Sequence, residues 1–232
     1  MNDQNLFDTK LMKDDEVLTV RTDPDEITQQ ACESFGTRFE GISTFEQWKV
    51  PEICFDEFSI GVIHGGSGTG KSTLLNRLGE VQSVEWNHNK AVVSHFDSLD
   101  EASEKFGAVG FNTVPSWFKP FHILSNGEQF RADLARRISS NCIVDEFTSV
   151  VERNLAISTS IALRKYIKRN KLKNVVLATC HEDILPHLMP DWVIDTNEGE
   201  IELNPFQKSQ RVSSEFFNAH HLFGKNLGSI TI

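Results

Sequence analysis

The chain has 232 residues, of which 39% are hydrophobic and 24% are charged, so it is long enough to bury a core as one large α/β domain or two small ones. A formal net charge of −10 argues against nucleic acid as the default partner. No apolar run approaches the roughly 18 residues of a membrane-spanning helix, and the N-terminus lacks a signal-peptide pattern. We therefore expect a cytoplasmic protein without membrane insertion.

The first 33 residues carry a large share of the negative charge. This stretch contains nine acidic residues and three basic ones. Residues 16–22 alternate like a strand, and the next segment begins a helix with Asp23 as its N-cap and Pro24 in its first position, ending near Gly36. We expect residues 1–33 to form an acidic N-terminal extension exposed to solvent.

The rest of the chain alternates between strand and helix patterns. Apolar runs predict strands at 58–63, 91–96, 141–146 and 174–180, and a hairpin at 192–203. Helical patterns lie between them, at 74–78, 99–106, 127–138 and 151–170. The alternation predicts an α/β fold in which a mostly parallel sheet is flanked by helices and carries a small antiparallel portion. Residues 204–232 form a C-terminal extension of unknown role, with helical spacing at 216–223 and a possible short strand at 230–232.

A glycine-rich stretch follows the strand predicted at 58–63 and precedes a helix. It reads Gly65-Gly66-Ser67-Gly68-Thr69-Gly70-Lys71-Ser72-Thr73 and fits the phosphate-binding P-loop, G-x-x-x-x-G-K-[ST]. Glycines let backbone N–H groups turn towards a phosphate, and a helix N-terminus adds unpaired N–H groups and partial positive charge. Lys71 would contact the β- and γ-phosphates, and Ser72 would ligate Mg²⁺. The alternative, an ordinary glycine-rich turn, is disfavoured by the flanking strand and helix.

Two acids end the apolar run at 141–146. Asp145 and Glu146 therefore stand at the carboxyl edge of the predicted sheet, where open α/β sheets bind ligands. Beside a P-loop, Asp145 would hold Mg²⁺ through water, and Glu146 would polarise the attacking water. The alternative is a strand-to-loop boundary with two solvated acids.

The stretch from Leu124 to Ile138 resembles the signature motif of the ABC ATPase family, L-S-G-G-Q followed by a helix. Ser125 and Gly127 match the motif, whereas Asn126 replaces a glycine and Glu128 replaces a glutamine. The resemblance implies that these four residues contact the γ-phosphate of a nucleotide held by the P-loop of another protomer. The same pattern fits an ordinary serine N-cap with a capping-box glutamate, and both interpretations can hold at once.

Other segments resemble the family in the expected order. Residues 148–152 correspond to the D-loop, and His181, after the strand predicted at 174–180, stands where the family has a switch histidine that contacts the γ-phosphate. Lys71, Glu146 and His181 are therefore the candidate catalytic residues. The resemblance covers residues 35–203, and we assign 34–203 to a P-loop NTPase domain of the ABC type.

Two family features have weaker counterparts. The family stacks an aromatic residue on adenine, and the spacing to Lys71 favours Phe39, with Phe35 second; core packing explains either side chain at least as well. The Q-loop glutamine expected after the strand at 91–96 is missing, and His95 is its candidate substitute.

The signature region is short, because only 54 positions separate Lys71 from Ser125. In this the chain resembles compact, soluble ABC ATPases of prokaryotes and phages that are fused to, or encoded beside, a GNAT-type acetyltransferase. The resemblance implies an ATPase that uses ATP and Mg²⁺, pairs head to tail as an ATP-dependent homodimer, and acts on a macromolecular partner. A separate acetyltransferase is one candidate partner. Nucleic acid is another, through the basic run at 164–173, although a solvated helix C-terminus also explains that run.

Three other functions compete with this prediction. A nucleotide-binding subunit of a membrane transporter is disfavoured by the short signature region. A P-loop small-molecule kinase leaves the signature and His181 without a role. A scaffold that senses ATP without hydrolysing it is disfavoured by the presence of Glu146.

Overall fold

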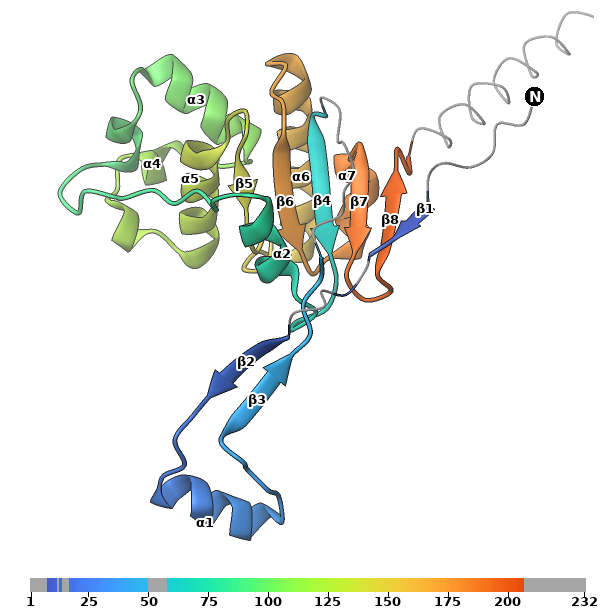
Figure 1. The fold of residues 1–232 in the computed structure, drawn as a ribbon. Helices are drawn as coiled ribbons and strands as arrows, with labels where there is room; N and C mark the ends of the chain where they lie inside the picture. Colours follow the sequence, from blue (N-terminus) through green and yellow to red (C-terminus); the bar gives the residue numbers. More distant parts are fainter. Residues whose placement is uncertain (1–7, 12, 14–16, 50–57, 207–232) are drawn as a thin grey trace, which may run out of the picture.

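The computed structural model describes residues 8–11, 13, 17–49 and 58–206, and its centre is a six-stranded sheet in the order β1-β8-β7-β4-β6-β5 (Figure 1). The strands are β1 (Asp8–Lys10), β4 (Ile60–His64), β5 (Ile143–Val144), β6 (Val175–Thr179), β7 (Trp192–Asp195) and β8 (Glu200–Leu203). Strands β4 to β7 run parallel, whereas β8 is antiparallel to β7 and β1. The predicted mostly parallel sheet with a small antiparallel portion is confirmed.

Helices cover both faces of this sheet. They are α2 (Lys71–Leu78), α3 (Leu99–Ala108), α4 (Val114–Trp117), α5 (Asn126–Arg137), α6 (Arg153–Arg169) and α7 (Leu185–Leu188). Because side chains alternate along a strand, Ile60 and Val62 of β4 pack with the cluster that holds α3, α5, α6 and α7, while Ile63 packs with α2 on the opposite face. No helix in the described part of the chain is both long and apolar enough to cross a bilayer.

Strand β4 delivers the P-loop from the middle of the sheet. All five of its residues are buried, as expected for a strand between two parallel neighbours. Gly61 lies beside Trp192 of β7, and a Cβ at Gly61 would come within 2.0 Å of the indole ring. The glycine is therefore required for β4 and β7 to pair in this register.

Residues 17–45 form a unit, here called the arm, that projects beyond the carboxyl ends of the central strands (Figure 1). Its strands β2 (Leu18–Arg21) and β3 (Ile42–Phe45) pair with each other, and α1 (Glu26–Phe35) joins them. The helix ends at Gly36 as predicted, but its N-cap is Asp25 rather than Asp23. The Asp25 carboxylate accepts the Thr28 N–H at 2.8 Å, which satisfies one of the free donors at the helix start.

One further expectation differs from the structure. The strand predicted at 91–96 is a 3₁₀ helix over Val92–His95. In the acidic extension, β1 pairs with β8 at the edge of the main sheet and β2 pairs within the arm, while residues 17–27 are exposed. The patterns at 216–223 and 230–232 lie outside the described residues.

Candidate functional site

The loops that follow β4, β5 and β6 meet around a cavity of about 350 Å³. Its lining comprises Ser67, Gly68, Gly70, Lys71, Ser72, Thr73, Asp145, Glu146, Ser149, Thr179 and Cys180. Parallel strands place their carboxyl ends at one edge of the sheet, and ligands bind outside that edge. The structure thus brings most of the predicted P-loop and both predicted carboxylates to one cavity. Cys180, which the sequence did not single out, also lines it.

The Lys71 side chain is hydrogen-bonded to the backbone of the P-loop itself. The Lys71 ammonium group donates to the carbonyl oxygens of Gly65 at 2.8 Å and Gly66 at 2.5 Å. Helix α2 begins at Lys71 directly after Gly70, whose φ of 92° lies in the left-handed region that glycine adopts without strain. A helix N-terminus and an ammonium group at one point form a site for an anion.

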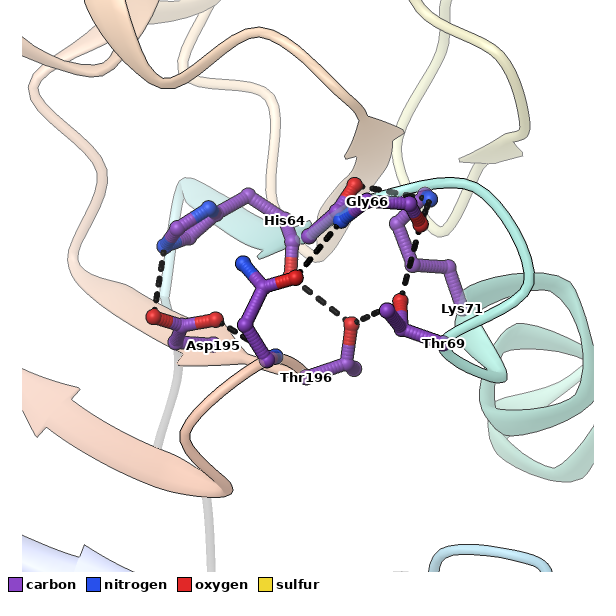
Figure 2. Close-up of polar contacts among 8 residues, drawn as sticks. His64, Gly66, Thr69, Lys71, Asp195 and Thr196 are labelled. Carbon is purple, nitrogen blue, oxygen red and sulfur yellow. Dashed lines mark hydrogen bonds and ion pairs between the residues drawn. The ribbon is translucent and has the colours of Figure 1, made fainter.

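The turn between β7 and β8 supports the P-loop through side chains that the sequence did not single out (Figure 2). Asn197 Oδ1 accepts the Gly66 N–H at 2.8 Å. Thr196 Oγ1 lies 2.6 Å from Thr69 Oγ1 and 3.0 Å from the His64 carbonyl oxygen, to which it can donate. These bonds hold the first half of the P-loop against the end of β7.

Asp145 and Glu146 follow β5 in a loop with unusual backbone angles. Glu146 has a φ of 53° and Thr148 a φ of 68°, in the left-handed region that residues other than glycine seldom adopt. The Asp145 carboxylate accepts the Glu146 N–H at 2.7 Å, and the Glu146 carbonyl accepts the Ser149 N–H at 3.1 Å. Asp145 is half-buried, whereas Glu146 is exposed, so the Glu146 carboxylate is accessible to a ligand in the cavity.

Ser72 and Asp145 line the same cavity and are the expected pair of Mg²⁺ ligands. Magnesium usually keeps several waters and takes one or two carboxylates together with substrate phosphates. A hydroxyl and a carboxylate next to a phosphate-binding loop fit that requirement. Across the described ranges, no group of three or more His, Cys, Asp or Glu side chains is placed to hold a metal by itself. The residues present therefore suit Mg²⁺ bound together with a nucleotide.

His181 follows β6 and is oriented by the loop that carries Glu146. Its Nδ1 lies 3.1 Å from Thr148 Oγ1, and that hydroxyl donates to the Phe147 carbonyl at 2.6 Å. Because the hydroxyl has only one proton, Nδ1 must carry the hydrogen in the neutral ring, which leaves Nε2 as the acceptor. Burial lowers the pKa of His181 below its ordinary value of 6.5, and the nearby Arg153 cation lowers it further. His181 is therefore mostly neutral at pH 7.

The signature residues lie outside the cavity of the P-loop. Ser125 caps α5, and its N–H and hydroxyl both donate to the Glu128 carboxylate, at 3.0 and 2.8 Å. Hydrogen bonds from Ser116 and Ser125 hold the pKa of Glu128 below its usual range. Asn126 and Gly127 form the first turn of α5, where Asn126 is exposed. The capping box is thus present, and none of its residues lines the P-loop cavity of the same chain.

A second cavity, of about 610 Å³, also borders the P-loop, and its aromatic side chains are Phe45 and Trp48. The Trp48 indole N–H donates to the Thr69 carbonyl at 2.8 Å, which fixes this side chain to the loop. Phe39, our candidate for contact with adenine, lines neither cavity that borders the P-loop, and neither does Phe35. Both lie in the arm, so the aromatic side chains that the structure places beside the P-loop are Phe45 and Trp48.

His95, the candidate substitute for the missing Q-loop glutamine, lies away from the P-loop cavity. Its Nε2 accepts the Asn87 N–H at 3.0 Å, and its Nδ1 lies 3.0 Å from the Ala91 carbonyl. Both ring nitrogens therefore bind the backbone of their own loop, and His95 does not line the P-loop cavity.

No family model matches the chain, and no curated protein matches it in sequence. Among solved structures, the ATP-binding cassette MJ0796, a dimer in a post-hydrolysis state bound to ADP and Pi, is similar over 85% of this chain and 99% of its own, with 15% identity and a TM-score of 0.52. The chain has the P-loop NTPase fold of an ATP-binding cassette. Another structure of MJ0796, described as a dimeric bacterial ABC transporter cassette, covers 65% of this chain and 87% of its own, with 14% identity and a TM-score of 0.48. A bacterial Atm1-family ABC exporter with ATP bound covers 69% of this chain and 35% of its own, with 16% identity and a TM-score of 0.47.

Proposed function

We propose that the chain is a soluble ATPase of the ABC type that works as an ATP-gated, head-to-tail homodimer on a macromolecular partner. The observation that carries the proposal is the separation of two phosphate-binding elements. The P-loop shares its cavity with Asp145 and Glu146, whereas the signature helix start at Ser125 lies outside that cavity. A second copy related by a two-fold axis would supply the missing signature to each P-loop.

The candidate catalytic and metal-binding residues then have chemical roles, and all of them except His181 line the cavity. The P-loop and Lys71 would bind the β- and γ-phosphates, and Ser72 with Asp145 would hold Mg²⁺, which neutralises phosphate charge when bound. Glu146, exposed to the cavity, would orient and deprotonate the attacking water. The neutral His181, with Nε2 free to accept, would contact the water or the γ-phosphate through a proton that one of them carries.

ATP would drive closure because it binds the paired state better than the separate chains. A ligand at about 100 times its dissociation constant stabilises the state that binds it by ~2.7 kcal/mol per site. Hydrolysis and phosphate release remove the contacts that bridge the two chains, so the dimer would reopen. The output would be a cycle of closing and opening applied to the partner. The two candidate partner classes are a separate acetyltransferase, which the family resemblance implies, and a nucleic acid, which the net charge of −10 does not favour.

The test is the Glu146→Gln variant, which keeps the shape of the side chain but removes the base. We expect this variant to form a dimer with ATP and Mg²⁺ and to remain a monomer without them, as measured by size-exclusion chromatography. The wild-type chain should release phosphate slowly in the same buffer, and Lys71→Ala should not release phosphate. A Glu146→Gln variant that stays monomeric in saturating ATP would refute the head-to-tail model.

A further inference from the structure

The exposed apolar side chains of this chain are concentrated in a few segments. Among the described residues, the large hydrophobic side chains that are exposed are Val17, Leu18, Val20, Ile27, Phe35, Ile42, Phe45, Leu99, Val114, Phe118, Ile123 and Val150. The first seven belong to the arm. Three others, Val114, Phe118 and Ile123, lie in the segment just before the signature and are called here the pre-signature patch. Clusters of this kind mark interaction surfaces, whereas single exposed residues need no explanation.

The arm has little core of its own. Helix α1 has ten residues and none of them is buried, and all four residues of β2 are exposed. An isolated helix of this length and an isolated two-stranded sheet are each marginally stable in water. Ile27 is 74% exposed and Phe35 is 84% exposed, so the apolar side chains of α1 gain little from the fold of a single chain. The arm therefore needs a surface that covers it.

The segment that carries the pre-signature patch also exposes apolar side chains, and it contains a lysine. Neighbouring side chains of the same segment turn inwards, since Trp117 packs on Phe106 and Phe121 stacks on Trp86, whereas Phe118 is 67% exposed. Residues 111–126 contain Lys119 and no acidic residue, whereas residues 17–45 contain five acids and two bases. The segment of the patch therefore offers one exposed cation, Lys119, which also acts on Glu128, to the acidic arm of a second copy.

We infer that the arm of one chain packs on the pre-signature patch of a second copy of this chain. The inference rests on the proposed head-to-tail pairing, which places the second chain's signature over the P-loop. The arm begins beside the P-loop, where Phe45 lines the second cavity, and it projects past the edge of the sheet that the second chain would cover (Figure 1). A two-fold axis repeats the contact, so each dimer contains two arm–patch pairs.

The first test changes the arm in the full-length Glu146→Gln background. The double substitution Ile27→Asp and Phe35→Asp should weaken ATP-dependent pairing at least tenfold in sedimentation experiments, because charges would enter an apolar contact. Binding of a fluorescent ATP analogue by the monomer should be unchanged. The matched control is Leu99→Asp, which alters a 67% exposed side chain in the first turn of α3, and it should pair like its parent. If the arm variant pairs as tightly as the control, the arm serves another partner and the inference is wrong.

The second test mixes arm-variant and patch-variant chains to show whether the arm contacts the patch. Phe118→Asp should weaken pairing as the arm variant does. A mixture of arm-variant and patch-variant chains should pair more tightly than either alone, because the mixed dimer retains one unchanged arm on one unchanged patch. No recovery on mixing would overturn the inference even if both single variants pair weakly. If the Glu146→Gln parent itself fails to pair, the proposed function fails instead, so the two failures are distinguishable.

Discussion

At the scale of single residues, the P-loop depends on partners that are distant in sequence. Asn197 and Thr196 bond to Gly66 and Thr69 across 131 and 127 positions. A Cβ on Gly65 would lie 2.2 Å from Thr196 Oγ1, so this glycine is required for close approach as well as for its φ of 152°. The motif predicts a phosphate-binding loop, but the side chains that hold this loop in place follow only from the pairing of β4 with β7.

His181 supplies a pH-dependent prediction. Its folded pKa lies below 6.5, mainly because of burial and then because of Arg153, while Asp183 opposes the shift. Arg153 pairs with Asp183, so Arg153→Gln removes a cation and also frees a carboxylate. Both effects favour the imidazolium, and the NMR titration midpoint of His181 should rise. Asp183→Asn should lower it. Equal midpoints in the two variants would contradict this electrostatic account.

The lowered pKa of His181 also determines how the free energy of unfolding changes with pH. Since the folded pKa is depressed, the unfolded chain binds the proton more readily as the pH falls below about 6.5. His181 therefore contributes to the free energy of unfolding above that pH, and its contribution is lost as the pH falls through the folded pKa. A His181→Gln variant should show a weaker loss of stability than the wild type between neutral and mildly acidic pH.

At the scale of secondary structure, the contact between β4 and β7 can be tested directly. Gly61→Ala would force a methyl group into the Trp192 ring, and overpacking of this kind costs about 1–3 kcal/mol or more. Trp192→Leu should relieve the clash, so the double variant should lose less stability than the sum of the two single changes. Urea unfolding followed by circular dichroism measures all three. Gly107→Ala on α3, where a Cβ meets nothing within 4 Å, is the control and should be neutral or stabilising.

Most elements could be predicted because their apolar periodicity and their caps agree. The P-loop strand and helix, α5, α6 and the β7–β8 hairpin lie where the patterns place them. The strand predicted at 91–96 failed because an apolar run does not distinguish a strand from a buried turn. There Val92 is buried and His95 bonds to its own loop, so side-chain packing and local hydrogen bonds outweigh β-propensity. The sequence did not place Phe45 and Trp48 beside the P-loop for a related reason, since no spacing rule describes how the arm returns to that loop.

At the scale of the whole molecule, the proposed function treats one chain as carrying two incomplete halves of a site. The P-loop cavity holds residues from the loops after β4, β5 and β6, and the signature helix start belongs to the layer of α3 and α5. In addition, the arm and the patch hold ten of the large apolar side chains that are exposed among the described residues. Both observations are explained if the functional unit contains two copies.

Complementation between inactive chains tests this unit. Lys71→Ala removes the ammonium group from the P-loop. Gly127→Asp places a carboxylate in the first turn of α5, where a helix tolerates it but a γ-phosphate from the other chain would be repelled. A Cβ at Gly127 meets no atom closer than 3.8 Å, so the variant should fold. Each variant alone should lose ATPase activity, because every site of its homodimer contains the change.

In a mixed dimer, both changes fall in one site and leave the other site intact. An equal mixture should therefore recover phosphate release to roughly a quarter of the wild-type rate, since about half of the dimers are mixed and each has one intact site. A mixture as inactive as its components would contradict a site shared between two chains. A shared site would also be contradicted if Gly127→Asp alone retained full activity, because the signature would then play no part in hydrolysis.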